Sequence, residues 1–299
     1  MKLMDYGLQP LDFQNPNVAP DPSDSGLSRR SFVMTSLASG FAVASSPVLA
    51  QAITTDSTGL VAGEVSVPVA DGKIPAYRAV PAAPGKYPVL LVVQEIFGVH
   101  EHIKDMCRRF AKQGYYAIAP EMYARQGDVS KMTEIGTILS TVVAKVPDAQ
   151  VNADLDAAVA FAGASGNGDT ARLGLVGYCW GGRAAWVYAV HNPKLKVAVS
   201  YYGLLDGMKS AIKPQDPVDF AANLKVPVLG LYAGIDGFVK PAVIDQMRAG
   251  LVKSGSGSEI VIFPNVNHGF NADYRPTYDK SAAAYAQKLT NDWLKERGV

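Results

Sequence analysis

The segment 173–182 is the feature that most restricts the fold of this chain. An apolar run at 173–176 is followed at once by Gly-Tyr-Cys-Trp-Gly-Gly at 177–182. Glycines two residues before and two residues after a central residue are typical of a strained turn from a strand into a helix, where neighbouring backbones leave no room for a Cβ atom. The segment therefore predicts a turn with Cys179 exposed at its apex, at the top of a sheet. The alternative is a structural cysteine in an unrelated glycine-rich turn.

Cys179 in such a turn has the surroundings of a nucleophile. It would lie at a helix N-terminus, whose partial positive charge favours thiolate and whose N–H groups can hold an oxyanion. A histidine and an acid are also needed, in the chain order nucleophile, acid, histidine. Asp236 and His268 follow in that order, just after the apolar runs 226–231 and 260–263. Because open α/β sheets place their chemistry at the carboxyl ends of strands, we predict a Cys179-His268-Asp236 triad. Singly, a turn aspartate and a capping or solvated histidine remain possible.

The rest of the chain predicts one alternating α/β domain. Residues 64–80, with Asp-Gly between two alternating stretches, predict a hairpin. Further strands are expected at 89–93, 116–119, 173–177, 197–201, 228–231 and 260–263, and helices at 103–112, 151–162, 182–190, 241–251 and 282–295. The alternation predicts a mostly parallel sheet with helices on both faces. The segment 202–226 is too short for a lid domain.

These motifs together resemble the dienelactone hydrolase family. They are Gln-Glu-Ile-Phe-Gly at 94–98, Met-Tyr-Ala-Arg-Gln-Gly at 122–127, the elbow at 177–182, the Asp236 loop, and His-Gly-Phe at 268–270. The resemblance extends from about residue 64 to the C-terminus. It implies an α/β-hydrolase fold and a Cys-His-Asp triad that hydrolyses small lactones or esters bearing a carboxylate.

The resemblance also implies roles for three residues beside the triad. Glu95 matches a glutamate that contacts the resting thiol, and Ile96 and Trp180 would supply the N–H groups of an oxyanion hole. Burial at a strand end should raise the pKa of Glu95 and let it exchange a proton with the thiol. An ion pair of Glu95 with Arg78 or Arg125 is the alternative.

The substrate contacts follow from the same resemblance. Arg125 matches an arginine that holds the substrate carboxylate. The position of the family's second such arginine is Ala272 here, which weakens the case for dienelactone itself, although Arg275 is close enough in sequence to replace it. Trp180, Tyr201 and Tyr202 are expected to line the pocket, although aromatic residues at strand ends are more often part of the core.

Composition agrees with a cofactor-free enzyme. The chain has 299 residues, of which 48% are hydrophobic, enough for one large core. Lys plus Arg (28) nearly balance Asp plus Glu (27), so nothing indicates a nucleic-acid partner. Cys107 and Cys179 are the only cysteines, which argues against a disulfide framework. His100 and His102 lack the companions of a metal site. We expect no metal, no cofactor and a monomer.

The first residues predict export. Ser-Arg-Arg-Ser-Phe-Val at 28–33 is a twin-arginine signature, and the apolar run 34–44 and small residues around Ala50 and Ala52 follow it. A disordered tail with a chance arginine pair is the alternative. We expect delivery by the twin-arginine (Tat) machinery to the periplasm or exterior, with no stable membrane association afterwards. The chain then divides into 1–52 (a disordered segment and the signal), 53–63 (a linker) and 64–299 (the hydrolase-like domain).

The predicted activity is hydrolysis of a small lactone or ester through a thioester on Cys179. A broad-specificity carboxylesterase or thioesterase of the same fold is one alternative. An exported protein that binds a small molecule without turnover is another, since a fold by itself does not establish catalysis.

Overall fold

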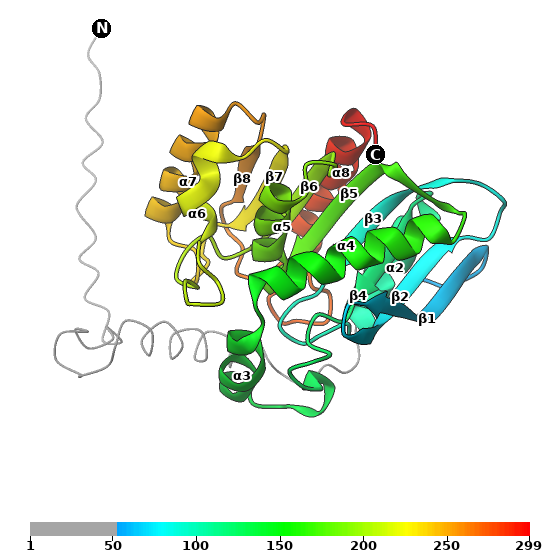
Figure 1. Cartoon of the computed structure of the whole chain (residues 1–299). Coiled ribbons are helices and arrows are strands. Elements are labelled where there is room, and N and C mark those ends of the chain that lie inside the picture. Colours follow the sequence, from blue (N-terminus) through cyan, green and yellow to red (C-terminus); the bar gives the residue numbers. More distant parts are fainter. Residues whose placement is uncertain (1–52) are drawn as a thin grey trace, which may run out of the picture.

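A sheet of eight strands forms the centre of the molecule, in the order β1-β2-β4-β3-β5-β6-β7-β8 (Figure 1). The computed structural model describes residues 53–299, so the twin-arginine signature and its cleavage site lie outside the described residues. β1 pairs antiparallel with β2 and β2 with β4, while all other neighbours pair in parallel. The strands are β1 (Leu60–Val69), β2 (Gly72–Pro81), β3 (Tyr87–Val93), β4 (Tyr116–Pro120), β5 (Gly168–Tyr178), β6 (Val197–Tyr201), β7 (Val228–Ala233) and β8 (Glu259–Phe263). This sheet confirms the predicted fold class.

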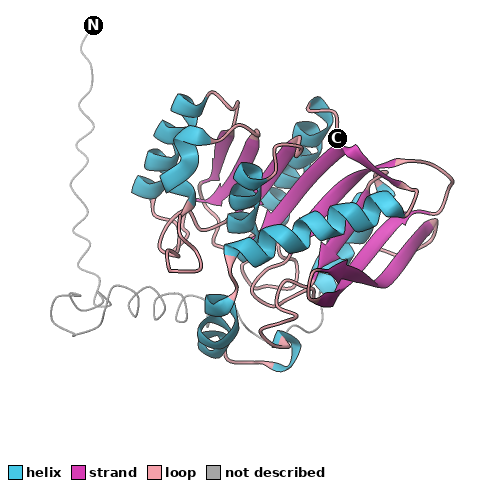
Figure 2. Cartoon of the chain, viewed as in Figure 1, coloured by secondary structure: helices cyan, strands magenta, loops and turns pink. Residues whose placement is uncertain are grey.

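Helices cover both faces of the sheet (Figure 2). α4 (Asp148–Ala164) and α5 (Trp180–His191) lie in front of the sheet in this view, and α2 (Glu101–Lys112) and α8 (Lys280–Glu296) lie behind it. α7 (Pro241–Ser254) packs against β8 and the short turns α6 (Pro217–Phe220) and η4 (Ala221–Asn223). Among residues 53–299, no helix is long and apolar enough to cross a membrane.

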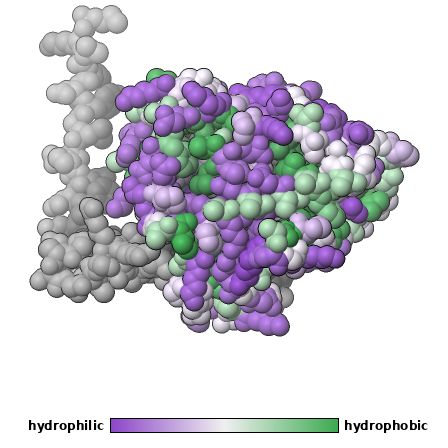
Figure 3. Space-filling view, in the orientation of Figure 1, coloured by the Kyte–Doolittle hydropathy of each residue, from purple (hydrophilic) through white to green (hydrophobic). Residues whose placement is uncertain are grey.

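The apolar residues of the central strands form the core. Every residue of the run 89–93 in β3 is fully buried, as expected for a strand that lies between two parallel neighbours and two helical layers. Cys107 of α2 is also fully buried, and burial raises the pKa of its thiol. The outer face shown in Figure 3 is covered mainly by hydrophilic residues, with apolar residues in separate groups.

The sheet begins earlier than the sequence suggests. β1 starts at Leu60, which pairs with Pro81, so residues 60–63 of the expected linker belong to the hairpin. Residues just before the strand are also held in place, because the N–H of Thr55 donates to Asp105 Oδ1 at 2.6 Å and Arg108 Nε donates to the Thr55 carbonyl at 2.8 Å. The strand is at the edge of the sheet and only partly buried, so its first residues show no clear alternation.

One further segment matters for the site. Between β4 and α4 the chain makes the short turns η1 (Val129–Lys131), α3 (Ile135–Thr137), η2 (Ile138–Val142) and η3 (Val143–Lys145). Buried Lys213 donates to the carbonyl oxygens of Val143 and Ala144 at 3.1 and 3.3 Å, which fixes this segment to the loop that follows β6.

Candidate active site

The turn between β5 and α5 has the predicted elbow geometry. Cys179 has φ 54° and ψ −112°, a backbone conformation that is strained for any residue with a Cβ atom. A Cβ atom on Gly177 would lie 1.9 Å from the carbonyl oxygen of Gly181, and one on Gly181 would lie 2.4 Å from that of Val93. The close approach of backbones therefore accounts for both glycines. In contrast to the prediction of an exposed apex, Cys179 is only 5% exposed, because it lies in the wall of a cavity.

The structure brings the three predicted triad residues together. His268, in the loop after β8, places Nε2 3.3 Å from Cys179 Sγ and Nδ1 2.9 Å from Asp236 Oδ2. Asp236 follows β7, and its other carboxylate oxygen accepts the N–H of Phe238 at 2.8 Å. The rings of Tyr202 and Phe238 both lie 4.9 Å from the imidazole. The imidazole is thus held between the sulfur and a carboxylate.

The charges around His268 favour its protonated form. Burial alone would lower the pKa of its imidazole, but the negative charges of Asp236 and Cys179 and the hydrogen bonds to both outweigh burial and raise that pKa to about 10. The structure thus places a positively charged imidazolium 3.3 Å from Cys179 Sγ. The arrangement therefore suits a sulfur nucleophile at neutral pH.

The two residues expected to form an oxyanion hole flank the sulfur. Ile96, which follows β3, and Trp180, the first residue of α5, both line the cavity with Cys179 and His268. The N–H of a first helical residue has no acceptor within its own helix. In residues 53–299, the N–H of Ile96 likewise donates to no other group. Both N–H groups are thus available to an oxyanion.

The cavity is almost entirely apolar. Its walls come from the loop after β3, the turns η2 and η3, the elbow, and the loops after β6, β7 and β8. The lining residues are Ile96, Leu139, Val143, Ala144, Cys179, Trp180, Arg183, Leu204, Met208, Phe238 and His268. Four of these residues, Leu139, Val143, Leu204 and Met208, are not indicated by the sequence. Their apolar side chains carry no motif, and only the packing of two distant segments brings them to Cys179.

Glu95 is not bound to the thiol, in contrast to the prediction. Its fully buried carboxylate is paired with Arg275, with Nη2 at 2.8 Å from Oε1. It also accepts the hydroxyl of Tyr274 and lies 3.3 Å from His100 Nε2. Burial would raise the pKa of Glu95, but Arg275 and His100 outweigh burial and hold that pKa well below its usual range. The predicted rise in pKa is therefore wrong: Glu95 is an ionised carboxylate in a buried ion pair.

Neither Arg125 nor Tyr201 reaches the cavity. The guanidinium of Arg125 makes paired hydrogen bonds of 2.6 and 2.7 Å to Asp71 and of 2.8 and 3.0 Å to Asp154, which tie the hairpin turn to α4. Tyr201 is fully buried in the core, where its hydroxyl shares a hydrogen bond of 2.8 Å with Thr290. The salt bridges of Arg125 to two carboxylates and the burial of Tyr201 in the core account for both differences from the prediction.

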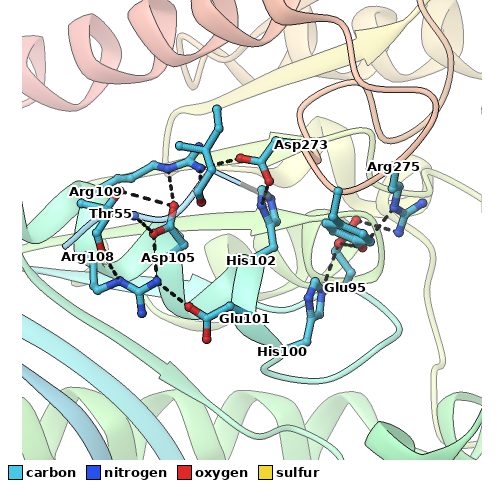
Figure 4. A network of polar contacts seen from close by, with 12 residues as sticks. Thr55, Glu95, His100, Glu101, His102, Asp105, Arg108, Arg109, Asp273 and Arg275 are labelled. Atoms are coloured by element: carbon cyan, nitrogen blue, oxygen red, sulfur yellow. Dashed lines mark hydrogen bonds and ion pairs between the residues drawn. The ribbon is translucent and has the colours of Figure 1, made fainter. Parts of the chain in front are cut away.

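A second set of buried charges lies beside the Glu95 pair (Figure 4). Asp273 accepts from Arg109 and lies 3.1 Å from His102 Nδ1, so the loop that carries His268 is fastened to α2. Asp105, 1% exposed, binds both Arg108 and Arg109 at 2.9 and 2.6 Å. Within residues 53–299, no group of three or more His, Cys, Asp or Glu side chains is arranged to hold a metal ion.

Fold and site together define the class of the protein. A cysteine at a strand-to-helix elbow, with acid and histidine at the ends of later parallel strands, is the arrangement of an α/β-hydrolase. The model of the "Dienelactone hydrolase family" matches residues 74–298, and the chain belongs to that family.

Individual relatives agree. A "Putative carboxymethylenebutenolidase" of Methylorubrum extorquens is 58% identical over 274 residues, which cover 91% of this chain and 94% of the relative. One of the same description from Escherichia coli K12 is 48% identical over 265 residues, covering 88% and 97%. The crystal structure of a "Putative Dienelactone Hydrolase" from Klebsiella pneumoniae superposes with a TM-score of 0.77 at 47% identity, covering 79% of this chain and 99% of that one. The chain is thus a hydrolase of the carboxymethylenebutenolidase type, acting on esters or lactones.

Proposed function

We propose that the protein hydrolyses small lactones or esters with Cys179 as nucleophile, His268 as proton carrier and Asp236 as the acid that orients it. The observation that carries the proposal is the chain of contacts from Sγ to Nε2 at 3.3 Å and from Nδ1 to the Asp236 carboxylate at 2.9 Å. These are the distances at which a nucleophile, a base and an orienting group act as one unit.

The first half of the reaction forms a thioester. The Cys179 thiolate attacks the carbonyl carbon, and the N–H groups of Ile96 and Trp180 stabilise the oxyanion that forms. When the tetrahedral intermediate collapses, the C–O bond breaks and the alkoxide leaving group takes the proton of the His268 imidazolium.

The second half restores the enzyme. His268, now neutral, takes a proton from a water molecule, whose oxygen attacks the thioester. Collapse of the second tetrahedral intermediate breaks the C–S bond and releases the carboxylic acid. Asp236 keeps Nδ1 protonated and the ring oriented toward the sulfur throughout.

A burst experiment tests the proposal. Mixing the purified mature protein with excess p-nitrophenyl ester should release one equivalent of p-nitrophenol rapidly when deacylation is slower than acylation, and mass spectrometry of the quenched protein should place the acyl group on the peptide that contains Cys179. An acyl group on another residue, or turnover that persists in Cys179→Ala, would contradict the proposal. The same assay with thioester and ester substrates compares the alternative of a broad thioesterase or carboxylesterase.

We also propose that residues 28–52 direct export by the twin-arginine route and that the mature protein is a monomer outside the cytoplasm. The support is the arginine pair followed by an apolar run and small residues. Replacing both Arg29 and Arg30 by lysine should leave the precursor uncut in the cytoplasm, since the receptor reads the arginine pair rather than its charge. Processed double mutant in the periplasm would refute the route.

A further inference from the structure

We infer that this enzyme selects neutral lactones or esters with an apolar acyl group and rejects acyl groups that carry a carboxylate. The inference rests on the proposed function, because it concerns the substrate of the same cysteine. It departs from the expectation of a carboxylate-bearing substrate, and the observation behind it is the composition of the cavity wall together with the position of each nearby arginine.

The wall around Cys179 offers mostly hydrocarbon. Leu139 and Val143 come from the turns between β4 and α4, and Leu204 and Met208 come from the loop after β6. Ile96, Trp180 and Phe238 complete the apolar lining. Burying an ionised carboxylate among such side chains without a counter-charge costs several kcal/mol, whereas an apolar acyl group gains from the same burial.

None of the three arginines near the sheet edge supplies that counter-charge. Arg125 is bound by Asp71 and Asp154 and is not part of the wall. Arg275 is 1% exposed in its side chain and paired with Glu95, and it also lies outside the wall.

Arg183 is the one arginine of the wall, and its charge is already balanced. It donates to both carboxylate oxygens of Asp148 at 2.7 and 3.0 Å and to the carbonyl oxygen of Gln215 at 2.9 Å. A second carboxylate, that of Asp216, lies 3.8 Å from its Nε. A substrate carboxylate would therefore have to compete with two protein carboxylates for the same guanidinium.

Two isosteric esters test the inference directly. In p-nitrophenyl isocaproate the acyl chain ends in an isopropyl group, and in p-nitrophenyl hemisuccinate a carboxylate of the same shape replaces it. After subtraction of uncatalysed hydrolysis, we expect kcat/KM to favour isocaproate by about 100-fold or more, given the cost of an unpaired buried charge. An equal kcat/KM, or a preference for hemisuccinate, would overturn the inference.

A charge placed in the wall should reverse the selection. Met208 is partly exposed, so an arginine can replace it without entering the core. Met208→Arg should raise kcat/KM for hemisuccinate at least about 10-fold relative to isocaproate. Met208→Gln is the matched neutral control and should leave hemisuccinate the poorer substrate. Asp148→Asn, which releases part of Arg183, should shift the ratio in the same direction as Met208→Arg.

The results separate this inference from the proposed function. Turnover of both esters through an acylated Cys179, with hemisuccinate preferred, refutes only the substrate class. Absence of an acylated Cys179 with either ester refutes the proposed function, and the substrate class with it.

Discussion

The loop after β3 joins two regions of opposite character. Ile96 lines the apolar cavity at Cys179, while Glu95, one residue earlier, lies in a buried ion pair with Arg275, to which His100 and the hydroxyl of Tyr274 add polar contacts. The charged region contacts α2 and the loop that carries His268, and the cavity contacts the substrate in the proposed reaction. The charges around Glu95 hold loops in place, whereas the cavity wall has as polar groups the thiol, the imidazole and the guanidinium of Arg183, which is bound to Asp148.

The largest expected effect is in the cavity. Cys179→Ala should lower kcat for ester hydrolysis by about 10⁴-fold or more, because no other group in the cavity wall can form the acyl intermediate. Stability should change by less than about 1 kcal/mol, since only a sulfur atom at the cavity wall is lost. Steady-state hydrolysis and urea unfolding of the same preparation measure the two effects. A loss of stability well above this value, together with the loss of activity, would show that Cys179 supports the fold as well.

The next effect lies in the charged region. Glu95→Gln should lower the free energy of unfolding by about 4 kcal/mol, because the buried guanidinium of Arg275 loses its counter-charge. Urea unfolding provides the measurement. The double variant Glu95→Gln with Arg275→Leu removes both charges and should be more stable than the single variant.

The same variant separates two roles of Glu95. A structural ion pair leaves the rate of Cys179 alkylation by iodoacetamide unchanged, because the carboxylate makes no hydrogen bond to Sγ. A markedly faster or slower alkylation in Glu95→Gln would instead support direct control of the thiol.

The pKa of His268 predicts how the stability of the protein depends on pH. Its pKa is raised to about 10 in the folded protein, mainly by Asp236 and Cys179 against the effect of burial. The contribution of protonated His268 to the free energy of unfolding is therefore fully present below the ordinary histidine pKa of about 6.5. This contribution is lost as the pH rises through about 10.

Relative to His268→Gln, the wild-type protein should lose about 3 kcal/mol of unfolding free energy between pH 6.5 and 10. Urea unfolding of both proteins across this range measures the difference. If the free energies of unfolding of the two proteins changed in parallel with pH, the raised pKa of His268 would be contradicted.

Arg125 gives the smallest effect and the sharpest test of where substrates bind. Arg125→Met should change kcat/KM for isocaproate and hemisuccinate esters less than about twofold, since the side chain does not line the cavity. It should cost about 1–2 kcal/mol of stability, because the buried carboxylate of Asp154 is left without its partner, whereas water can solvate the exposed carboxylate of Asp71. A selective loss of hemisuccinate turnover in this variant would show that Arg125 contacts the substrate.

Local patterns were enough to predict the framework of this protein. Alternating apolar runs and helical spacing predicted the hairpin, the strands and the main helices, because each depends on residues close in sequence. The elbow was predicted for a similar reason, since the two glycines that mark it, Gly177 and Gly181, are only four residues apart in the sequence. The order of Cys179, Asp236 and His268 then placed them at the carboxyl ends of β5, β7 and β8, because parallel strands share one carboxyl edge.

Only the tertiary structure decided which charges meet and what lines the cavity. Glu95 and Arg275 are 180 positions apart, and Arg125 and Asp71 are 54 apart, so no local spacing indicates either pair. An arginine binds the carboxylates that packing brings nearest. Arg125 and Arg275 are therefore paired with carboxylates of the protein and do not line the cavity. The apolar residues Leu139 and Met208 acquire their place in the same way, because two segments without a motif pack against each other over Cys179. The sequence by itself thus determined the proposed nucleophile and its partners, while long-range packing determined which side chains line the cavity beside it.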